Sequence, residues 1–154
     1  MTKHYLRLIL MSMVPLIELR GAIPYSQLVG LPIVKSYILS IIANMIPIPI
    51  VFLFARHVLR WGMDKPVIGK FFKFCLEKGL GAGDKLTENR KRGAFIALML
   101  FVGIPVPGTG AWTGALAASL IGMRFRDSMI SIFLGVIIAG IIMATASYFG
   151  FNLL

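Results

Sequence analysis

The sequence has few of the residues that metal sites and disulfides require. Its 154 residues include one cysteine, Cys75, and two histidines, His4 and His57. A single cysteine cannot form an intrachain disulfide or a metal cluster, and the two histidines have no partners at metal-ligand spacing. We therefore expect no metal and no cofactor. Serines such as Ser12 and Ser26 lack a histidine at membrane depth, so we also expect no enzymatic activity.

Charge is scarce as well, and it is unbalanced. Charged residues make up 14% of the chain, against roughly 25% in soluble domains. Six of them are acidic and sixteen are basic. The basic residues cluster between apolar segments, without the interleaved aromatics that a nucleic-acid groove needs. This pattern follows the positive-inside rule of membrane proteins, so we expect no nucleic-acid partner.

Hydrophobic residues make up 58% of the chain, and the mean hydropathy is +0.86. Together with the segment lengths, this composition predicts an all-α integral membrane protein with a single membrane domain over residues 1–154. We divide that domain into a first half at 1–60, an amphipathic connector at 61–92 and a second half at 93–154. The location we predict is the plasma membrane of a bacterium or archaeon, crossed several times.

Two short apolar segments begin the first half, at Leu8–Ile17 and Ile23–Val34. Each is too short to cross about 30 Å of hydrocarbon, which needs about 20 residues. The Glu18–Gly21 stretch between them predicts a turn. The two segments and this turn together predict a re-entrant helical hairpin. Non-helical backbone at such depth is tolerated only inside protein or along a water-filled cavity.

An acid and a base stand in this turn, at Glu18 and Arg20, with helix breakers on both sides: Pro15 before them, and Gly21 and Pro24 just after. An ionisable residue at membrane depth is costly and indicates a functional site by default. The alternative is that the two charges neutralise each other, or bond backbone groups at the hairpin tip, and only hold the fold.

A full-length span follows at Tyr37–Ala55, with Asn44 and a Pro47–Pro49 interruption inside it. One interpretation is a kinked helix that packs on its neighbours, and the other is a hinge or an unwound lining of the site. Asn44 is therefore a candidate site residue.

The connection at Arg56–Arg92 carries ten basic and four acidic residues, which predicts a cytoplasmic location. Within it, Lys65–Leu80 places apolar residues at helical spacing between lysines. This pattern predicts an amphipathic helix at the membrane surface or, alternatively, a helix packed on the protein's own cytoplasmic face.

The second half repeats the plan of the first. Short apolar pieces at Gly93–Val106 and Ala111–Met123 flank a breaker at Pro105–Gly110, and Ser128–Phe151 is a full span. Each half has one full span, so we predict an inverted repeat with a substrate site at the midplane. Twelve basic residues then fall inside and three outside, with the N-terminus outside.

The motifs Glu18–Pro24 and Gly103–Gly110 resemble the bacterial and archaeal family named "putative small multidrug export protein" over nearly the whole chain. Their plan also resembles the DedA/VTT superfamily, whose paired re-entrant hairpins and embedded charges are linked to translocation of polyisoprenyl phosphates or phospholipids. This chain is shorter and has Thr109 where that superfamily places an acid, so proton coupling would rest on Glu18.

These observations lead to three functional hypotheses. In the first, a transporter moves an anionic amphiphile, with Arg20 binding the phosphate and Glu18 coupling to protons. In the second, Glu18 exchanges lipophilic cations for protons; in the third, the protein is a structural module. We expect membrane lipids and a second copy of the chain as partners. The candidate site residues are Glu18, Arg20, Gly21, Pro24, Asn44, Pro105, Pro107, Gly108, Thr109, Gly110 and Arg124.

Overall fold

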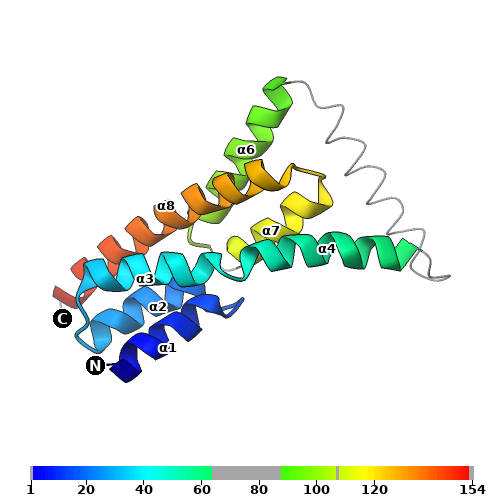
Figure 1. Ribbon diagram of the computed structural model, residues 1–154. Helices are drawn as coiled ribbons and strands as arrows, with labels where there is room; N and C mark the ends of the chain where they lie inside the picture. Colours follow the sequence, from blue (N-terminus) through cyan, green and yellow to red (C-terminus); the bar gives the residue numbers. More distant parts are fainter. Residues whose placement is uncertain (1, 64–87, 107, 153–154) are drawn as a thin grey trace.

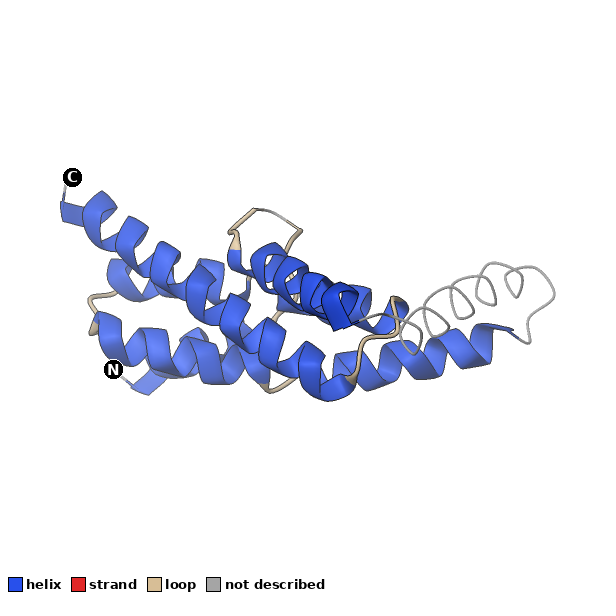
Figure 2. Ribbon diagram, turned by 90° about the horizontal axis from the view of Figure 1, so that it is seen from above, coloured by secondary structure: helices blue, strands red, loops and turns tan. Residues whose placement is uncertain are grey.

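The computed structural model describes residues 2–63, 88–106 and 108–152, and every regular element in these ranges is an α-helix (Figures 1 and 2). The predicted all-α class is thus confirmed for the part of the chain described. The amphipathic helix predicted at Lys65–Leu80 lies outside the described residues, as does Pro107. The helices are α1 (Thr2–Met13), α2 (Glu18–Leu28), α3 (Ile33–Met45), α4 (Ile48–Met63), α6 (Glu88–Gly103), α7 (Ala111–Leu120) and α8 (Phe125–Asn152).

The first two helices form an antiparallel hairpin, but its turn is not where the sequence predicted it. The chain turns at Val14–Ile17, and Glu18 already begins α2. Pro15 in this turn cannot donate a backbone hydrogen bond, which favours the end of α1 at Met13. Helical bonding then resumes immediately, with the Gly21 N–H donating to the Ile17 carbonyl at 3.0 Å. The Glu–x–Arg–Gly segment is therefore the first turn of a helix.

Pro24 was also predicted as a helix breaker, and this is wrong. It lies inside α2, which continues to Leu28. Proline removes one helical hydrogen bond without necessarily ending a helix when neighbouring helices support it. Here α2 packs against α1, α3 and α8, which provide that support.

A second helical hairpin is formed by α6 and α7, with the connection at residues 104–110. This break is where the sequence predicted it. Gly108 has φ +87°, a left-handed conformation that glycine adopts freely, and so it allows the turn. The backbone of Gly110 is extended and caps the start of α7.

Within the described ranges, two stretches are long and apolar enough to cross a membrane, Ile33–Ala55 and Phe125–Gly150. The first consists of α3 and the start of α4, which Figure 1 shows nearly in line, interrupted between Met45 and Ile48 at Pro47. In both halves, a helical hairpin is thus followed by a long apolar stretch. Their inversion across the membrane stays a prediction.

The boundaries predicted at residues 60 and 92 fall inside helices. The first helix concerned, α4, runs on to Met63, and α6 already begins at Glu88. The division into two halves and a connector stays a prediction, since a charged side chain can reach water without ending the helix that carries it.

Glycines set the closest helix contacts around the core. A Cβ on Gly135 of α8 would lie 2.7 Å from both the Met99 carbonyl oxygen and Val102 Cβ of α6. Large apolar side chains also face outward, and Leu16 is 94% exposed. An exterior of this kind, together with two long apolar stretches, fits an all-α membrane protein.

Candidate functional site

The connections of the two helical hairpins lie against each other. The predicted acid and base, Glu18 and Arg20, lie at this contact. Glu18 is the first residue of α2, and Arg20 follows within the same helical turn. Both side chains reach across to the connection between α6 and α7. The hydrogen bonds of each charged side chain therefore join one hairpin to the other.

The carboxylate of Glu18 binds the N-terminus of α7. It accepts hydrogen bonds from the backbone N–H groups of Ala111 at 3.3 Å and Trp112 at 3.2 Å, one on each oxygen. The first N–H groups of a helix lack partners within the helix and carry partial positive charge, so an anion is stabilised there. Glu18 is only 4% exposed, which strengthens this interaction.

The backbone of Glu18 is strained. Its φ is +50°, and it is the only non-glycine residue with positive φ among the described residues. For an L-residue the left-handed conformation costs roughly 1–2 kcal/mol. Strain of this kind persists only where the surrounding structure enforces it, and it clusters at binding and switching sites.

Gly110 permits the close approach of the two hairpins. A Cβ at this position would overlap the carboxylate of Glu18. Its backbone N–H donates to the Thr113 hydroxyl at 2.8 Å, and that hydroxyl donates to the Gly110 carbonyl at 3.1 Å. The start of α7 is thus held by two side chains, Glu18 from outside and Thr113 from within.

Arg20 binds the other side of the same connection. Its guanidinium donates to the carbonyls of Val102 and Ile104, each at 3.2 Å, and also to those of Val106 and Thr109. The Val102 carbonyl is free for this contact because the Val106 N–H donates to Ile104 instead. Arg20 therefore satisfies carbonyls that the end of α6 leaves without helical partners.

A cavity of about 360 Å³ opens beside this network. Both charged side chains contribute to its wall, and the remainder is largely apolar. The lining residues are Pro15, Leu16, Ile17, Glu18, Arg20, Gly21, Pro105, Gly108, Gly110, Thr113 and Met143.

The structure brings together seven of the eleven predicted site residues. They are Glu18, Arg20, Gly21, Pro105, Gly108, Thr109 and Gly110. Three others do not line the cavity: Pro24 lies further along α2, Asn44 is buried on α3, and Arg124 is exposed between α7 and α8. The fourth, Pro107, lies outside the described residues.

Five lining residues were missed: Pro15, Leu16 and Ile17 of the first turn, Thr113 and Met143. Thr113 lies three residues after the cap at Gly110, a spacing typical of a capping box, and this signal was available in the sequence. Met143 comes from α8, and an unremarkable methionine in an apolar span gives no such signal.

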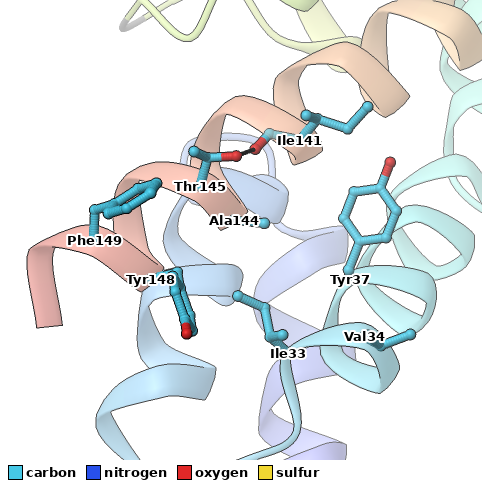
Figure 3. Close-up of a pocket in the computed structure, with 8 residues that line it drawn as sticks. All are labelled: Ile33, Val34, Tyr37, Ile141, Ala144, Thr145, Tyr148 and Phe149. Carbon is cyan, nitrogen blue, oxygen red and sulfur yellow. Dashed lines mark hydrogen bonds between the residues drawn. The ribbon is translucent and has the colours of Figure 1, made fainter. Parts of the chain in front are cut away.

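A second, apolar pocket lies between α3 and α8 (Figure 3). It has a volume of about 370 Å³ and contains none of the predicted site residues. Tyr37 on its α3 side donates to the Ile137 carbonyl of α8 at 3.2 Å. The residues of α8 that line this apolar pocket lie on a different face of the helix from Met143, which lines the charged cavity. The apolar pocket and the charged cavity are therefore separate.

Comparison with known proteins gives one match. The sequence model of a family described as "Putative small multi-drug export protein" matches residues 18–142, a range that begins just after the first hairpin connection and includes the second. No curated protein and no solved structure matches the chain.

Proposed function

The chain belongs to the putative small multi-drug export protein family, and we propose that this membrane transporter translocates an anionic amphiphile such as a polyisoprenyl phosphate or a phospholipid. The proposal rests on one observation. Among the described residues, Arg20 is the only cationic side chain that lines the cavity, and its guanidinium, which bonds carbonyls of residues 102–109, is less deeply buried than the Glu18 carboxylate. A half-buried guanidinium on an apolar wall suits a phosphate attached to a lipid tail.

Glu18 supplies a means of coupling to protons. Its carboxylate acts as an internal anion at the N-terminus of α7, where a phosphate would bind equally well. Protonation of Glu18 weakens its hold on the Ala111 and Trp112 N–H groups and removes a negative charge beside Arg20. Phosphate and proton binding are then mutually favourable, as linkage requires.

The proposed membrane arrangement agrees with this use of the site. In it both hairpins are re-entrant, the halves are inverted, the N-terminus is outside and segment 56–92 is cytoplasmic. Equal counts along α2 and α3 from their short connection bring Glu18 level with Ala43, one residue from Asn44, which is the middle residue of the apolar stretch Ile33–Ala55. A charged pair at that level is at the midplane, where transporters of inverted-repeat design bind substrate.

Two further proposals complete this arrangement. The membrane is the plasma membrane of a bacterium or archaeon, and the working unit is a homodimer. The exposed apolar turn around Leu16 and the exposed part of the 104–110 connection support a second copy, because irregular backbone at membrane depth must be covered by protein or face water.

Drug export is the second candidate, and the description of the family favours it. In that case Glu18 would release α7 and bind a lipophilic cation in exchange for protons. The cavity offers mainly apolar lining for such a ligand, but Arg20 would oppose its charge. The two functions therefore differ in which charged residue contacts the substrate.

Transport in reconstituted vesicles separates these functions. Arg20→Ala should abolish flipping of a fluorescent phosphate lipid, whereas Glu18→Gln should abolish export of a lipophilic cation. Gly135→Ala, which disturbs the distant α6–α8 contact, is a matched control for general destabilisation. If Arg20→Ala flips phosphate lipid as fast as the unmodified protein, the proposed function is wrong. If the unmodified protein moves neither substrate, a structural module remains.

A further inference from the structure

Three buried polar side chains on α3 have no hydrogen-bond partner among the described residues. They are Ser36, Ser40 and Asn44, each 0% exposed. Four-residue spacing places them on one face of the helix. Both hydroxyl oxygens and both polar atoms of the amide lack a partner. Buried polar side chains are nearly always hydrogen-bonded, so this row requires an explanation.

Other buried serines in the same environment differ from this row. The hydroxyl of Ser12 donates to the Leu8 carbonyl at 2.8 Å, Ser26 donates to Ile23 at 2.6 Å, and Ser119 donates to Phe52 at 3.1 Å. Bonding to a nearby carbonyl is the usual way in which a serine is satisfied in an apolar helix bundle. The row on α3 is therefore not a general property of the buried serines.

The flanking residues of α3 show which way the row faces. On one side Tyr37 contacts Gly140 and Ile137 of α8. On the other side Leu39 lies with Tyr5 of α1. The row lies between these flanks and faces the interior that α2 occupies between α1 and α8. There α2 contributes the small, fully buried side chains of residues 22 and 26.

Along the helix axis, the two ends of the row lie within one residue of the level of two titratable groups on α2. Because α2 and α3 run antiparallel from a short connection (Figure 1), equal counts bring Ser36 level with Tyr25, and bring Ala43, the neighbour of Asn44, level with Glu18. Tyr25 is half-buried, and its hydroxyl bonds His4 Nδ1 of α1 at 3.0 Å. The row spans about 12 Å between these levels.

We propose that Ser36, Ser40 and Asn44 hold a file of water molecules between α2 and α3, which joins the His4–Tyr25 end of the helices to the Glu18 carboxylate. Successive members of the row are about 6 Å apart along the axis, a distance that one bridging water covers with two hydrogen bonds. Such water satisfies every orphaned polar atom of the row. Its use as a proton path to Glu18 rests on the proposed function, but its existence does not.

Thiol labelling tests the water file without any transport measurement. In a Cys75→Ser background, single cysteines replace Ser36, Ser40 and Asn44, and 2-aminoethyl methanethiosulfonate is applied to the protein in vesicles. The cysteine thiolate attacks the reagent, forms a mixed disulfide with its aminoethylthio group and displaces methanesulfinate; a thiolate forms only where water is present. We expect all three cysteines to react at least tenfold faster than the controls. Equal, slow rates at all positions, or reaction at residue 36 alone, overturn the proposal.

The controls are cysteines at two other positions of α3. Ile41 is 8% exposed, belongs to the apolar core and lies about 100° around the helix from Ser40, so it reports a dry protein interior. Ile42 is 56% exposed on the outer, apolar side of α3, so it reports contact with lipid.

A matched pair of variants tests the proton path. Ser40→Thr keeps the hydroxyl, whereas Ser40→Val has nearly the same shape and lacks it. With a proton gradient as the driving force, we expect Ser40→Val to lower phosphate-lipid transport at least tenfold and Ser40→Thr to keep it within twofold. Equal rates in the two variants overturn the proton path. If the unmodified protein transports nothing, the proposed function fails, while labelling still decides the water file.

Discussion

Replacement of Gly110 by alanine tests whether the Glu18 carboxylate holds the two hairpins together. Gly110 has φ −109° and ψ −172°, an extended conformation that alanine adopts without strain. The added Cβ would nevertheless overlap the Glu18 carboxylate. The carboxylate must then leave the N-terminus of α7, so the substitution acts on the contact between hairpins and not on the backbone of Gly110.

The size of the effect follows from the hydrogen bonds that are lost. The N–H groups of Ala111 and Trp112 both donate to the carboxylate. A hydrogen bond to a charged group contributes about 1.5–3 kcal/mol, so the loss of two lowers the free energy of unfolding by about 3 kcal/mol or more. For a chain of this size, 3 kcal/mol lowers the Tm by about 6–12 °C.

Thermal unfolding in detergent, followed by circular dichroism, measures this change. The deciding comparison is Gly110→Ala in a Glu18→Ala background, where the added methyl group no longer meets a carboxylate. We expect its cost there to fall below about 0.5 kcal/mol, a strong departure from additivity. An equal loss of stability in both backgrounds would refute the reasoning. Gly93→Ala is the control, because a Cβ there meets nothing within 4 Å.

Three further substitutions test other contacts. Arg20→Lys should lower the Tm by about 4 °C or more, since one ammonium cannot replace a planar fork that bonds several carbonyls; an unchanged Tm would contradict this. In SDS unfolding titrations, the Glu18→Gly variant should be about 1 kcal/mol more stable than the Glu18→Ala variant, because glycine adopts φ +50° freely. The reverse order would show that backbone strain at Glu18 is unimportant. Gly135→Ala should cost about 1–3 kcal/mol by the same titration, whereas Gly150→Ala, which meets nothing within 4 Å, should be neutral; equal values would exclude a close α6–α8 contact at that glycine.

Local chemistry explains which parts of the fold could be predicted. The break at residues 104–110 was predicted correctly because prolines and glycines impose their effects on their own backbone. The first turn was misplaced by a few residues. The sequence predicted this turn at Glu18–Gly21. In the structure the turn precedes Glu18, and helical hydrogen bonding restarts there once the turn is complete. Pro24 was misjudged for a similar reason, since neighbouring helices support it inside α2.

Asn44 illustrates the limit for side chains. Its polarity within an apolar span marked it as a candidate, which the sequence alone allows. Among the described residues its amide has no hydrogen-bond partner, and neither have the hydroxyls of Ser36 and Ser40; this depends on where the carbonyls of other helices lie. Other serines of the chain have the same chemistry and are bonded, so residue type does not distinguish the two groups.

By itself, the sequence determined that this is an all-α membrane protein with two interrupted apolar regions and a charged pair beside the first interruption. These properties follow from segment length, hydropathy and the backbone preferences of proline and glycine. Only the tertiary structure decided what the charged pair binds. Arg20 and Glu18 contact backbone groups between 82 and 94 residues away, and nearly every residue carries the same N–H and C=O groups. A backbone partner leaves no mark on residue type, so folding alone selects it.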